Sequence, residues 1–193
     1  MMPAVPTGAA PCQRPLRRLA RPPALVVVRP RPGRPTEGLL AYAGRVEPCA
    51  LGRGGIRRLK REGDGATPAG RMALRAAFWR ADRRRRPATP LAIRAVGADD
   101  GWCDAPQDGR YNRPVKLPFA GSHETLIRED ELYDILVVLD FNLMPRRAHG
   151  GSAIFLHCAR PGLAPTAGCV ALPAGRLERL LARLPARARL AVV

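Results

Sequence analysis

The sequence of 193 residues lacks several features, and each absence excludes a class of protein. It has no run of about 18 consecutive apolar residues, so no segment is predicted to cross a membrane as a helix. Its N-terminal region carries arginines, but the longest apolar run there, residues 24–28, is shorter than the roughly 7–15 residues of a secretory signal. As written, the chain therefore shows no signal peptide.

The sequence also lacks cysteines spaced as paired metal ligands. The odd number of five and the absence of any C-x-x-C pair argue against a disulfide framework and a zinc ribbon. We expect at least one free thiol and no metal site, since His149, His157 and Cys169 match no common zinc spacing. The five are Cys12, Cys49, Cys103, Cys158 and Cys169.

Lysine and aromatic residues are rare, whereas arginine is abundant. The net charge is +17, with 33 Lys+Arg against 16 Asp+Glu, and aromatic residues make up 5%. This charge is typical of proteins that bind nucleic acid or an anionic surface, so an Arg-rich binding protein is the alternative from a second functional class. However, 21 prolines and 19 glycines accompany the arginines, as codon bias would produce, and the basic residues are spread along the chain. No nucleic-acid partner is therefore expected.

The remaining composition is that of one soluble globular domain with a tail. The hydrophobic fraction is 46% and the charged fraction 25%, both ordinary values. Residues 1–23 are rich in Pro, Arg and Ala without periodicity, which predicts a disordered tail. Residues 24–193 are predicted to form the folded domain.

Short β-branched and alternating segments predict a mainly β fold with a small helical component. Turn signals between residues 39 and 70 indicate short strands joined by tight turns, whereas 29–38 is predicted to be a turn or loop and 97–122 to be loop-like. One helix is predicted over 173–184, because Leu177, Leu180, Leu181 and Leu184 recur on one helical face. The other predicted strands are 24–28, 71–82, 132–141, 152–158 and 188–193.

A cysteine and a histidine near the C-terminus could perform nucleophilic catalysis. A thiol attacks carbonyls as the thiolate, so a catalytic cysteine needs a nearby base, and histidine suits this role. His157 ends an apolar strand and Cys169 follows twelve residues later, a distance that a strand, a loop and a return can close. Gly168 removes side-chain bulk where a substrate carbonyl would approach. In contrast, Cys158 is predicted to point to the opposite face and join the core.

These segments resemble the active-site signature of the L,D-transpeptidase catalytic domain (YkuD-like) family. Residues 151–157 (GSAIFLH) and 165–172 (PTAGCVAL) match its strand histidine and its [ST]-x-G-C segment. Upstream fragments in the same order are similar to one branch of the family, and the resemblance covers about residues 24–193. They are 60–70 (KREGDGATPAG), 101–104 (GWCD) with 111–112 (YN), and 122–134 (SHETLIREDELYD).

The resemblance implies a β-sandwich-like bacterial enzyme of peptidoglycan biosynthesis, which affects cell wall and cell shape, with no cofactor. It implies Cys169 as nucleophile and His157 as general base, with Thr166 and Gly168 shaping the turn at the oxyanion. A thioester forms on a peptidoglycan stem peptide, and transfer to another stem makes a cross-link. Transfer to water would be L,D-carboxypeptidase activity, and a relative without turnover would be a peptidoglycan binder. The implied location is the periplasm or cell envelope.

Two departures from the commoner family motif lie beside the cysteine. Ala167 occupies a position where the family often has His, and Val170 to Leu172 replace a usual Arg. Both departures leave the Cys–His pair intact, but they leave open how a stem peptide is recognised. The sequence also leaves open the acyl acceptor, the sensitivity to β-lactams and the oligomeric state. Tyr111, Asn112 and His149 are possible substrate-side residues.

One further expectation concerns polar residues upstream of this pair. A structural polar network, and only secondarily a set of substrate contacts, is predicted for His123, Glu124, Arg128, Asp130 and Tyr133. A papain-like peptidase is not indicated, because there the cysteine precedes its histidine in the chain, and a caspase-like order would place the histidine about 50 residues upstream.

Overall fold

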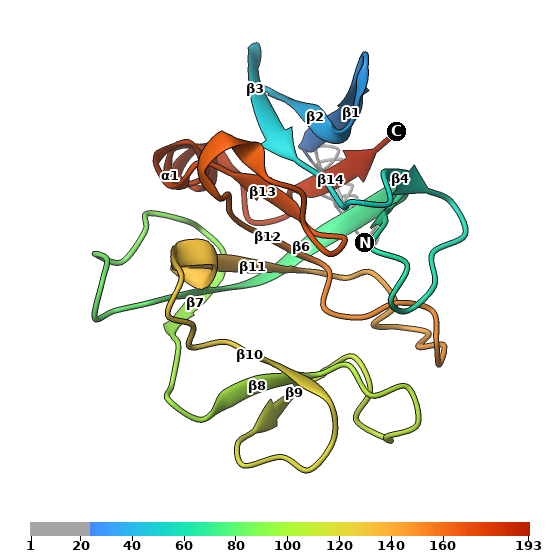
Figure 1. Ribbon diagram of the computed structural model, residues 1–193. Coiled ribbons are helices and arrows are strands. Elements are labelled where there is room, and N and C mark those ends of the chain that lie inside the picture. Colours follow the sequence, from blue (N-terminus) through green and yellow to red (C-terminus); the bar gives the residue numbers. More distant parts are fainter. Residues whose placement is uncertain (1–23) are drawn as a thin grey trace, which may run out of the picture.

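The computed structural model describes residues 24–193, and the predicted tail, residues 1–23, lies outside the described residues (Figure 1). The prediction of a mainly β fold is confirmed, because one α-helix, α1 (Ala174–Arg183), accompanies many strands. The strands are β1 (Leu25–Arg31), β2 (Arg34–Tyr42), β3 (Arg45–Ala50), β4 (Ile56–Arg57), β5 (Thr67–Pro68), β6 (Gly70–Trp79), β7 (Ala92–Ala95), β8 (Asp100–Cys103), β9 (Arg113–Lys116), β10 (His123–Thr125), β11 (Ile135–Leu139), β12 (Phe155–Cys158), β13 (Val170–Leu172) and β14 (Arg189–Val192). Two 3₁₀ turns are η1 (Glu131–Tyr133) and η2 (Pro161–Leu163).

The main sheet closes on itself. Its strand order is β11-β12-β13-β3-β2-β1-β14-β6-β7, and β11 also pairs with β6. The pairing of β11 with β6 closes the eight strands from β11 to β6 into a ring. Strand β7 lies outside the ring and pairs with β6 in parallel. The strands therefore surround one apolar core and leave few unpaired edges.

Strand alternation divides the apolar side chains between two cores. On β11, Ile135, Val137 and Leu139 point into the main core, whereas Leu136 and Val138 point into a second, smaller core. On β12, Cys158 lies in the main core and Phe155 in the second. The prediction that Cys158 is a core residue is confirmed.

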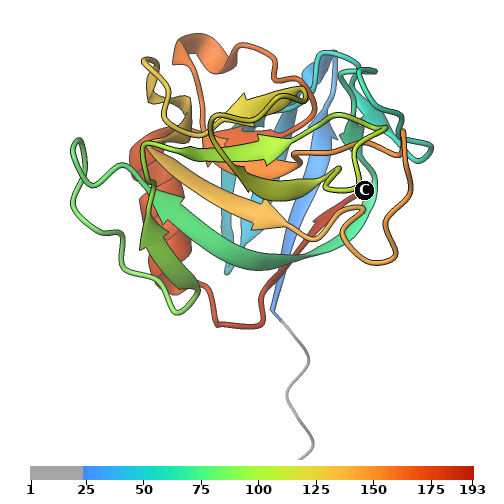
Figure 2. The same cartoon turned by 90° about the horizontal axis from the view of Figure 1, so that it is seen from below.

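A small three-stranded sheet, in the order β10-β8-β9, covers the second core (Figure 2). Trp102 on β8 packs edge-on against Phe155 on β12, with ring centroids 5.3 Å apart. Such an aromatic pair contributes about 0.5–1.5 kcal/mol beyond the burial of its surface. The layer between the small sheet and the main sheet therefore has a fixed width, and the candidate site lies in it.

The predicted helix is confirmed over Ala174–Arg183. Leu177, Leu180 and Leu181 are buried against the main core, and Leu184, which ends the helix, is buried as well. Pro173 directly precedes the helix, where its missing N–H has no intrahelical partner to lose. None of the helices within residues 24–193 has both the length and the apolar character needed to span a membrane.

The predictions for two loop-like regions are wrong in part, because both regions contain strands. Residues 29–38 form most of the β1–β2 hairpin, which turns at Pro32-Gly33, with Gly33 at φ +72°. This suits a type II turn, which places proline before a positive-φ glycine. Residues 97–122 contain β8 and β9, whose four-residue strands carry too few apolar residues to show a period. Both regions are ordered by strand pairing, which is local in each case: residues 29–31 pair with residues 34–39, and β8 pairs with β9 and β10.

Candidate active site

Cys169 and His157 lie on one face of two adjacent parallel strands. Strand β12 pairs with β13 in the register Leu156 to Val170 and His157 to Ala171. Cys169 directly precedes β13, so it shares a face with Ala171, and His157 lies on that same face. The thiol and the imidazole are therefore diagonal neighbours on the wall of the layer between the two sheets.

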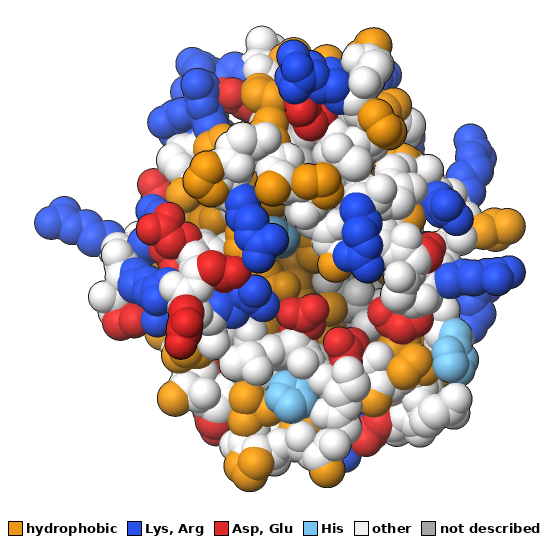
Figure 3. Space-filling model, in the orientation of Figure 1, with side chains coloured by type: hydrophobic (Ala, Val, Ile, Leu, Met, Phe, Trp, Pro, Cys, Tyr) orange, Lys and Arg blue, Asp and Glu red, His pale blue; other side chains and the backbone are white. Residues whose placement is uncertain are grey.

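This wall lines a cavity of about 500 Å³. Cys169, His157 and Tyr133 contribute from the main-sheet side, and Glu124 contributes from the small sheet. The hollow at the centre of the face in Figure 3 has acidic side chains along one side and Lys or Arg side chains along the other. A cavity of this size can hold several side chains of a substrate, which is far more than a single ion would need.

The Cys169 thiol is held by two backbone groups that precede β12. Its Sγ donates to the Ala153 carbonyl at 3.2 Å and accepts from the Phe155 N–H at 3.3 Å. Burial raises the pKa of Cys169 to about 12, and the nearby Glu124 carboxylate acts in the same direction, whereas the Phe155 N–H opposes it. The resting side chain is therefore a neutral thiol that becomes nucleophilic only when a base removes its proton.

His157 is buried and kept neutral. Burial lowers its pKa to about 4, and hydrogen bonds to the Cys158 and Leu132 backbone oppose that shift. Its Nδ1 lies 2.8 Å from the Cys158 carbonyl, which fixes Nδ1 as the protonated nitrogen and leaves Nε2 able to accept a proton. The Tyr133 ring packs edge-on at 5.3 Å and holds the imidazole plane.

The turn before Cys169 is built by Thr166 and Gly168. The Thr166 hydroxyl donates to the Cys169 carbonyl at 2.7 Å and accepts from the Gly168 N–H at 3.1 Å. Thr166 is itself anchored, since its N–H donates to Leu51 O at 2.9 Å. These bonds fix the backbone immediately before the thiol.

Gly168 is required by conformation and by space, because its φ is +140° and a Cβ atom would lie 2.8 Å from the Ala66 carbonyl oxygen. We expect Gly168→Ala to lower the free energy of unfolding by about 3 kcal/mol, since the backbone strain alone costs about 1–3 kcal/mol. Gly162→Ala is the matched control, with φ +68° and open space around its Cβ position. It should cost about 1 kcal/mol. Equal losses for the two variants in urea denaturation would show that the close approach to Ala66 is not limiting.

Tyr111 and Asn112 do not line the cavity but lie behind its wall. Both are buried. The Asn112 Oδ1 accepts from the Trp102 Nε1–H at 2.9 Å and from the Ala153 N–H at 3.1 Å. Asn112 thereby fixes the Ala153 carbonyl that accepts the thiol. Tyr111 donates to Glu62 and accepts from the Gly151 N–H at 3.0 Å. Their placement supports a positioning role instead of substrate contact.

His149 also lies away from the thiol. It is exposed, and its Nε2 is 3.1 Å from the Gln107 amide nitrogen. It lines a separate cavity together with Lys60, Arg61 and Arg147. The structure therefore places His157 and Cys169 together and leaves His149 outside their cavity.

The predicted polar network is present and reaches the cavity. Tyr133 donates to Glu124 at 3.3 Å, and Arg128 lies 3.8 Å from the same carboxylate. Arg128 also binds Asp130 through two hydrogen bonds, of 2.8 and 2.9 Å. His123, by contrast, is bonded to the Gly121 carbonyl and does not line the cavity.

Several cavity residues were not singled out from the sequence. They are Arg53, Glu62, Asp104, Ser152 and Arg160. Glu62, Asp104 and Ser152 do occur inside the family-like fragments 60–70, 101–104 and 151–157, which was the available signal. Their convergence depends on chain pairings that no local pattern encodes.

The comparisons with known proteins agree with this arrangement. The family model of the L,D-transpeptidase catalytic domain matches residues 36–193, which includes all the residues of the site described above. The chain has no match among the curated proteins or among the solved structures. Within residues 24–193, no group of three His, Cys, Asp or Glu side chains is arranged to hold a metal ion.

Proposed function

The chain belongs to the L,D-transpeptidase catalytic domain family, and we propose that it forms peptidoglycan cross-links through a thioester on Cys169. The observation that carries the proposal is the placement of a thiol and a neutral imidazole on one wall of one cavity. A buried thiol beside a base is the arrangement that nucleophilic acyl transfer requires.

In the first half of the proposed reaction, the Cys169 sulfur attacks the carbonyl carbon of a stem-peptide amide. His157 Nε2 takes the thiol proton as the C–S bond forms, and the carbonyl oxygen becomes an oxyanion. The N–H of Cys169 is the proposed donor to this oxyanion, since the Gly168 N–H is already bound to Thr166. The intermediate then collapses, the C–N bond breaks, and the imidazolium returns the proton to the departing amine.

In the second half, an amine of another stem attacks the thioester carbonyl. His157 takes a proton from the attacking nitrogen, the C–S bond breaks, and Cys169 leaves as the thiol after the proton is returned to it. Water in place of the amine would give a free carboxylate, which is carboxypeptidase activity. No redox step or cofactor enters this sequence.

The charge state of the pair supports base catalysis over a preformed ion pair. The pKa of Cys169 is raised to about 12 and that of His157 is lowered to about 4, in both cases chiefly by burial. Neutral forms of both groups therefore dominate around pH 7. Proton transfer is expected to accompany the attack on the carbonyl instead of preceding it.

The proposed substrate is a stem peptide that carries a carboxylate, and the proposed site of action is the periplasm or cell envelope. Arg53 lines the cavity, is exposed, and forms no ion pair within residues 24–193. Its guanidinium is a suitable partner for the carboxylate of the segment that leaves. Arg160 lines the same cavity but is already 3.3 Å from Asp130.

The test is incubation of the full chain with a tetrapeptide muropeptide, followed by intact-mass measurement and analysis of the released amino acid. We expect an adduct equal to the donor acyl group, release of the terminal D-Ala, and decay of the adduct when an acceptor amine is added. A dimer as product would identify transpeptidation, and a tripeptide would identify hydrolysis. A folded protein that forms no adduct and releases nothing would contradict the proposal and leave a peptidoglycan binder.

A further inference from the structure

A groove rimmed by arginines lies between the β2–β3 hairpin and α1, away from the active-site cavity. Leu40, Leu172 and Leu180 form part of its apolar floor. Leu172 belongs to β13, and its neighbour Ala171 lines the cavity that contains Cys169. Because neighbouring residues of a strand point to opposite sides, the groove and the active site lie on opposite faces of β13.

Two contacts hold the walls of this arginine groove at a fixed separation. At one end, Arg176 of α1 forms an ion pair with Glu47 of β3 at 2.7 Å. At the other end, the Tyr42 hydroxyl of β2 donates to the carbonyl of Arg183, the last residue of α1, at 3.0 Å. The groove is therefore part of the fold and needs no ligand to form.

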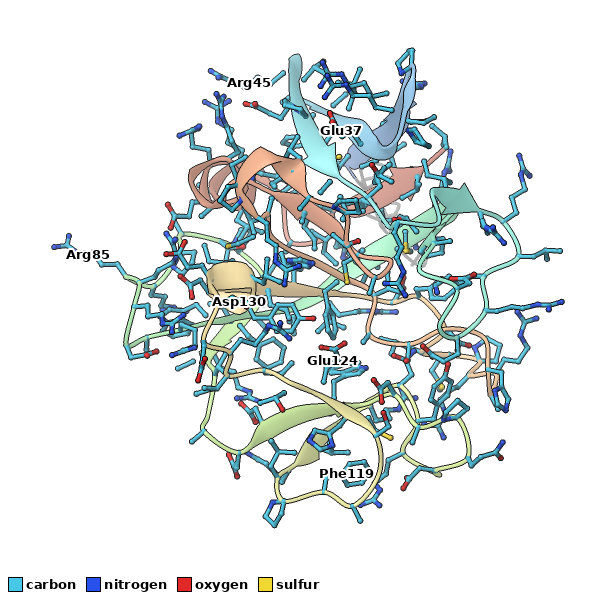
Figure 4. All side chains as sticks on the ribbon, viewed as in Figure 1. Glu37, Arg45, Arg85, Phe119, Glu124 and Asp130 are labelled. Carbon is cyan, nitrogen blue, oxygen red and sulfur yellow. The ribbon has the colours of Figure 1, made fainter. Side chains whose placement is uncertain are left out.

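Three arginines of the groove have no partner within residues 24–193. Arg45 of the hairpin and Arg179 and Arg183 of α1 are exposed, and their guanidinium groups form no ion pair or hydrogen bond there. Glu47, the acidic residue that lines the groove, is already bound to Arg176. Figure 3 shows Lys and Arg side chains gathered at the upper end of the molecule, and Figure 4 places Arg45 there, beside β3. Unpaired guanidinium groups around one groove favour an anionic ligand.

An apolar side chain accompanies these arginines at the tip of the hairpin. Val46 is 60% exposed and directly follows Arg45 on β3. Strand alternation points it to the opposite face of the hairpin, so the tip carries an arginine on one face and a valine on the other. The hairpin projects from the body of the molecule in Figure 1. A flat surface that meets the tip end-on therefore contacts both side chains.

The dimensions of the groove distinguish between possible anionic ligands. Its volume is about 30 Å³. A site for a small molecule usually encloses about 300–1,000 Å³, and a protein partner is usually anchored by a large side chain in a pocket. The groove is too small for either, whereas lipid headgroups contact basic residues at a surface without entering a pocket. The exposed valine adds an apolar group of the kind that enters the boundary between headgroups and acyl chains.

We propose that the arginine groove and the tip of the β2–β3 hairpin form a docking surface for the anionic phospholipid headgroups of a bilayer. The three unpaired arginines bind headgroup phosphates, and Val46 enters the interface beside them. In Figure 3 the active-site cavity lies at the centre of the visible face, whereas the hairpin lies at its upper end, so a bilayer at the tip leaves the cavity open. The inference is independent of the chemistry proposed for Cys169, because it uses no residue of the active site.

The test is co-sedimentation of the full chain with phospholipid vesicles. We expect binding to vesicles that contain phosphatidylglycerol, none to vesicles of phosphatidylcholine alone, and a loss of binding as salt rises. Replacement of the three groove arginines by glutamine should weaken binding about 100-fold, since each arginine near an anionic surface contributes about fivefold. This variant is Arg45→Gln/Arg179→Gln/Arg183→Gln.

The matched control removes three exposed arginines that lie outside the groove and also form no ion pair within residues 24–193. It is Arg58→Gln/Arg85→Gln/Arg86→Gln, which has the same net charge as the groove variant. Its binding should stay within about threefold of wild type, because charges farther from the bilayer than a Debye length are screened. Equal weakening of the two variants would show attraction by net charge alone and would overturn the docking surface. Absence of binding to the phosphatidylglycerol vesicles would overturn it as well.

Val46→Ser separates a bilayer from a soluble anion. Val46 is mostly exposed, so its replacement should leave the fold intact. We expect vesicle binding to weaken about fivefold, because less apolar surface enters the interface, and binding to heparin to be unchanged. Glycerol 3-phosphate in millimolar excess should fail to displace the protein from the vesicles. Unchanged vesicle binding of Val46→Ser, or displacement by glycerol 3-phosphate, would overturn the bilayer surface and assign the groove to a soluble anion.

Discussion

Cys169→Ala is expected to abolish acyl-enzyme formation and to reduce release of the terminal amino acid by a factor of about 10⁴ or more, because removal of a covalent nucleophile leaves only binding and oxyanion stabilisation. Among the described residues that line the cavity, three other side chains carry a hydroxyl group: Ser152, Thr166 and Tyr133. All three hydroxyls donate to other groups, respectively to Glu62, to the Cys169 carbonyl and to Glu124. None is therefore placed to replace the thiol.

The loss must be shown to be chemical instead of structural. Cys49→Ala is the matched control, since Cys49 is a buried thiol on β3 that does not line the cavity. Both variants should lose about 1 kcal/mol in free energy of unfolding, because each removes one buried sulfur atom. Only Cys169→Ala should lose the adduct in intact-mass spectra. Retention of the adduct in Cys169→Ala, mapped by peptide mass to another residue, would assign the nucleophile elsewhere.

The pH dependence of thiol alkylation gives a second measure of Cys169. Because burial raises its pKa to about 12, we expect its alkylation by iodoacetamide, mapped by peptide mass, to keep rising with pH well beyond pH 9. A reaction that reaches its plateau near neutral pH would instead indicate a resting thiolate, and the proposed order of proton transfer and attack would be wrong.

The sequence predicted the pair because the nearby fragments resemble a known family, and it could not predict the pair's geometry. Twelve residues separate His157 from Cys169, and many loops of that length would keep them apart. Their adjacency results from the parallel register of β12 with β13, which pairs His157 with Ala171. This register depends in turn on β3 and β11, the strands that pair with β13 and β12 on their other edges.

The β1–β2 hairpin was missed because its prolines resemble those of a loop. Pro30 pairs with Gly38 on β2, but it lies beyond the part of β1, residues 25–28, that also pairs with β14. Its missing N–H therefore breaks no bond on that edge of the strand. In contrast, α1 was predicted correctly because a repeat of leucines at helical spacing is a local signal.

The acidic residues that line the cavity could not be predicted as neighbours from local sequence. Glu62, Asp104 and Glu124 come from three segments that are each joined to the rest of the molecule by separate pairings, among them β8 with β10. A count of charges along the chain gives an excess of arginine, whereas the cavity is lined by these three acidic residues and by three arginines, Arg53, Arg128 and Arg160. The formal charges of the cavity lining are thus balanced, whereas the whole molecule is strongly positive.

His157→Gln is expected to lower the acylation rate by about 10²–10⁴, the usual contribution of a positioned general base. The wild-type rate should persist down to about pH 4 to 5, since burial lowers the pKa of His157 to about 4 and the imidazole stays neutral until then. His123→Gln removes a histidine outside the cavity and serves as the control for loss of an imidazole. A rate for His157→Gln within threefold of wild type would exclude His157 as the base.

The same variant should change the dependence of stability on pH, in a direction fixed by the sign of the pKa shift. The pKa of His157 lies below its unfolded value of 6.5, at about 4, so the unfolded chain binds the proton first as pH falls. The stability that comes from keeping His157 neutral is complete above pH 6.5 and is lost between pH 6.5 and 4, by about 3 kcal/mol. Urea denaturation of wild type at pH 7 and pH 4 should show this loss in addition to that of other groups, and His157→Gln should lack it. An equal loss in both proteins would mean that His157 is solvated in the folded state. A solvated imidazole would titrate near neutrality. The thiol would then lack the buried base that the proposed reaction requires.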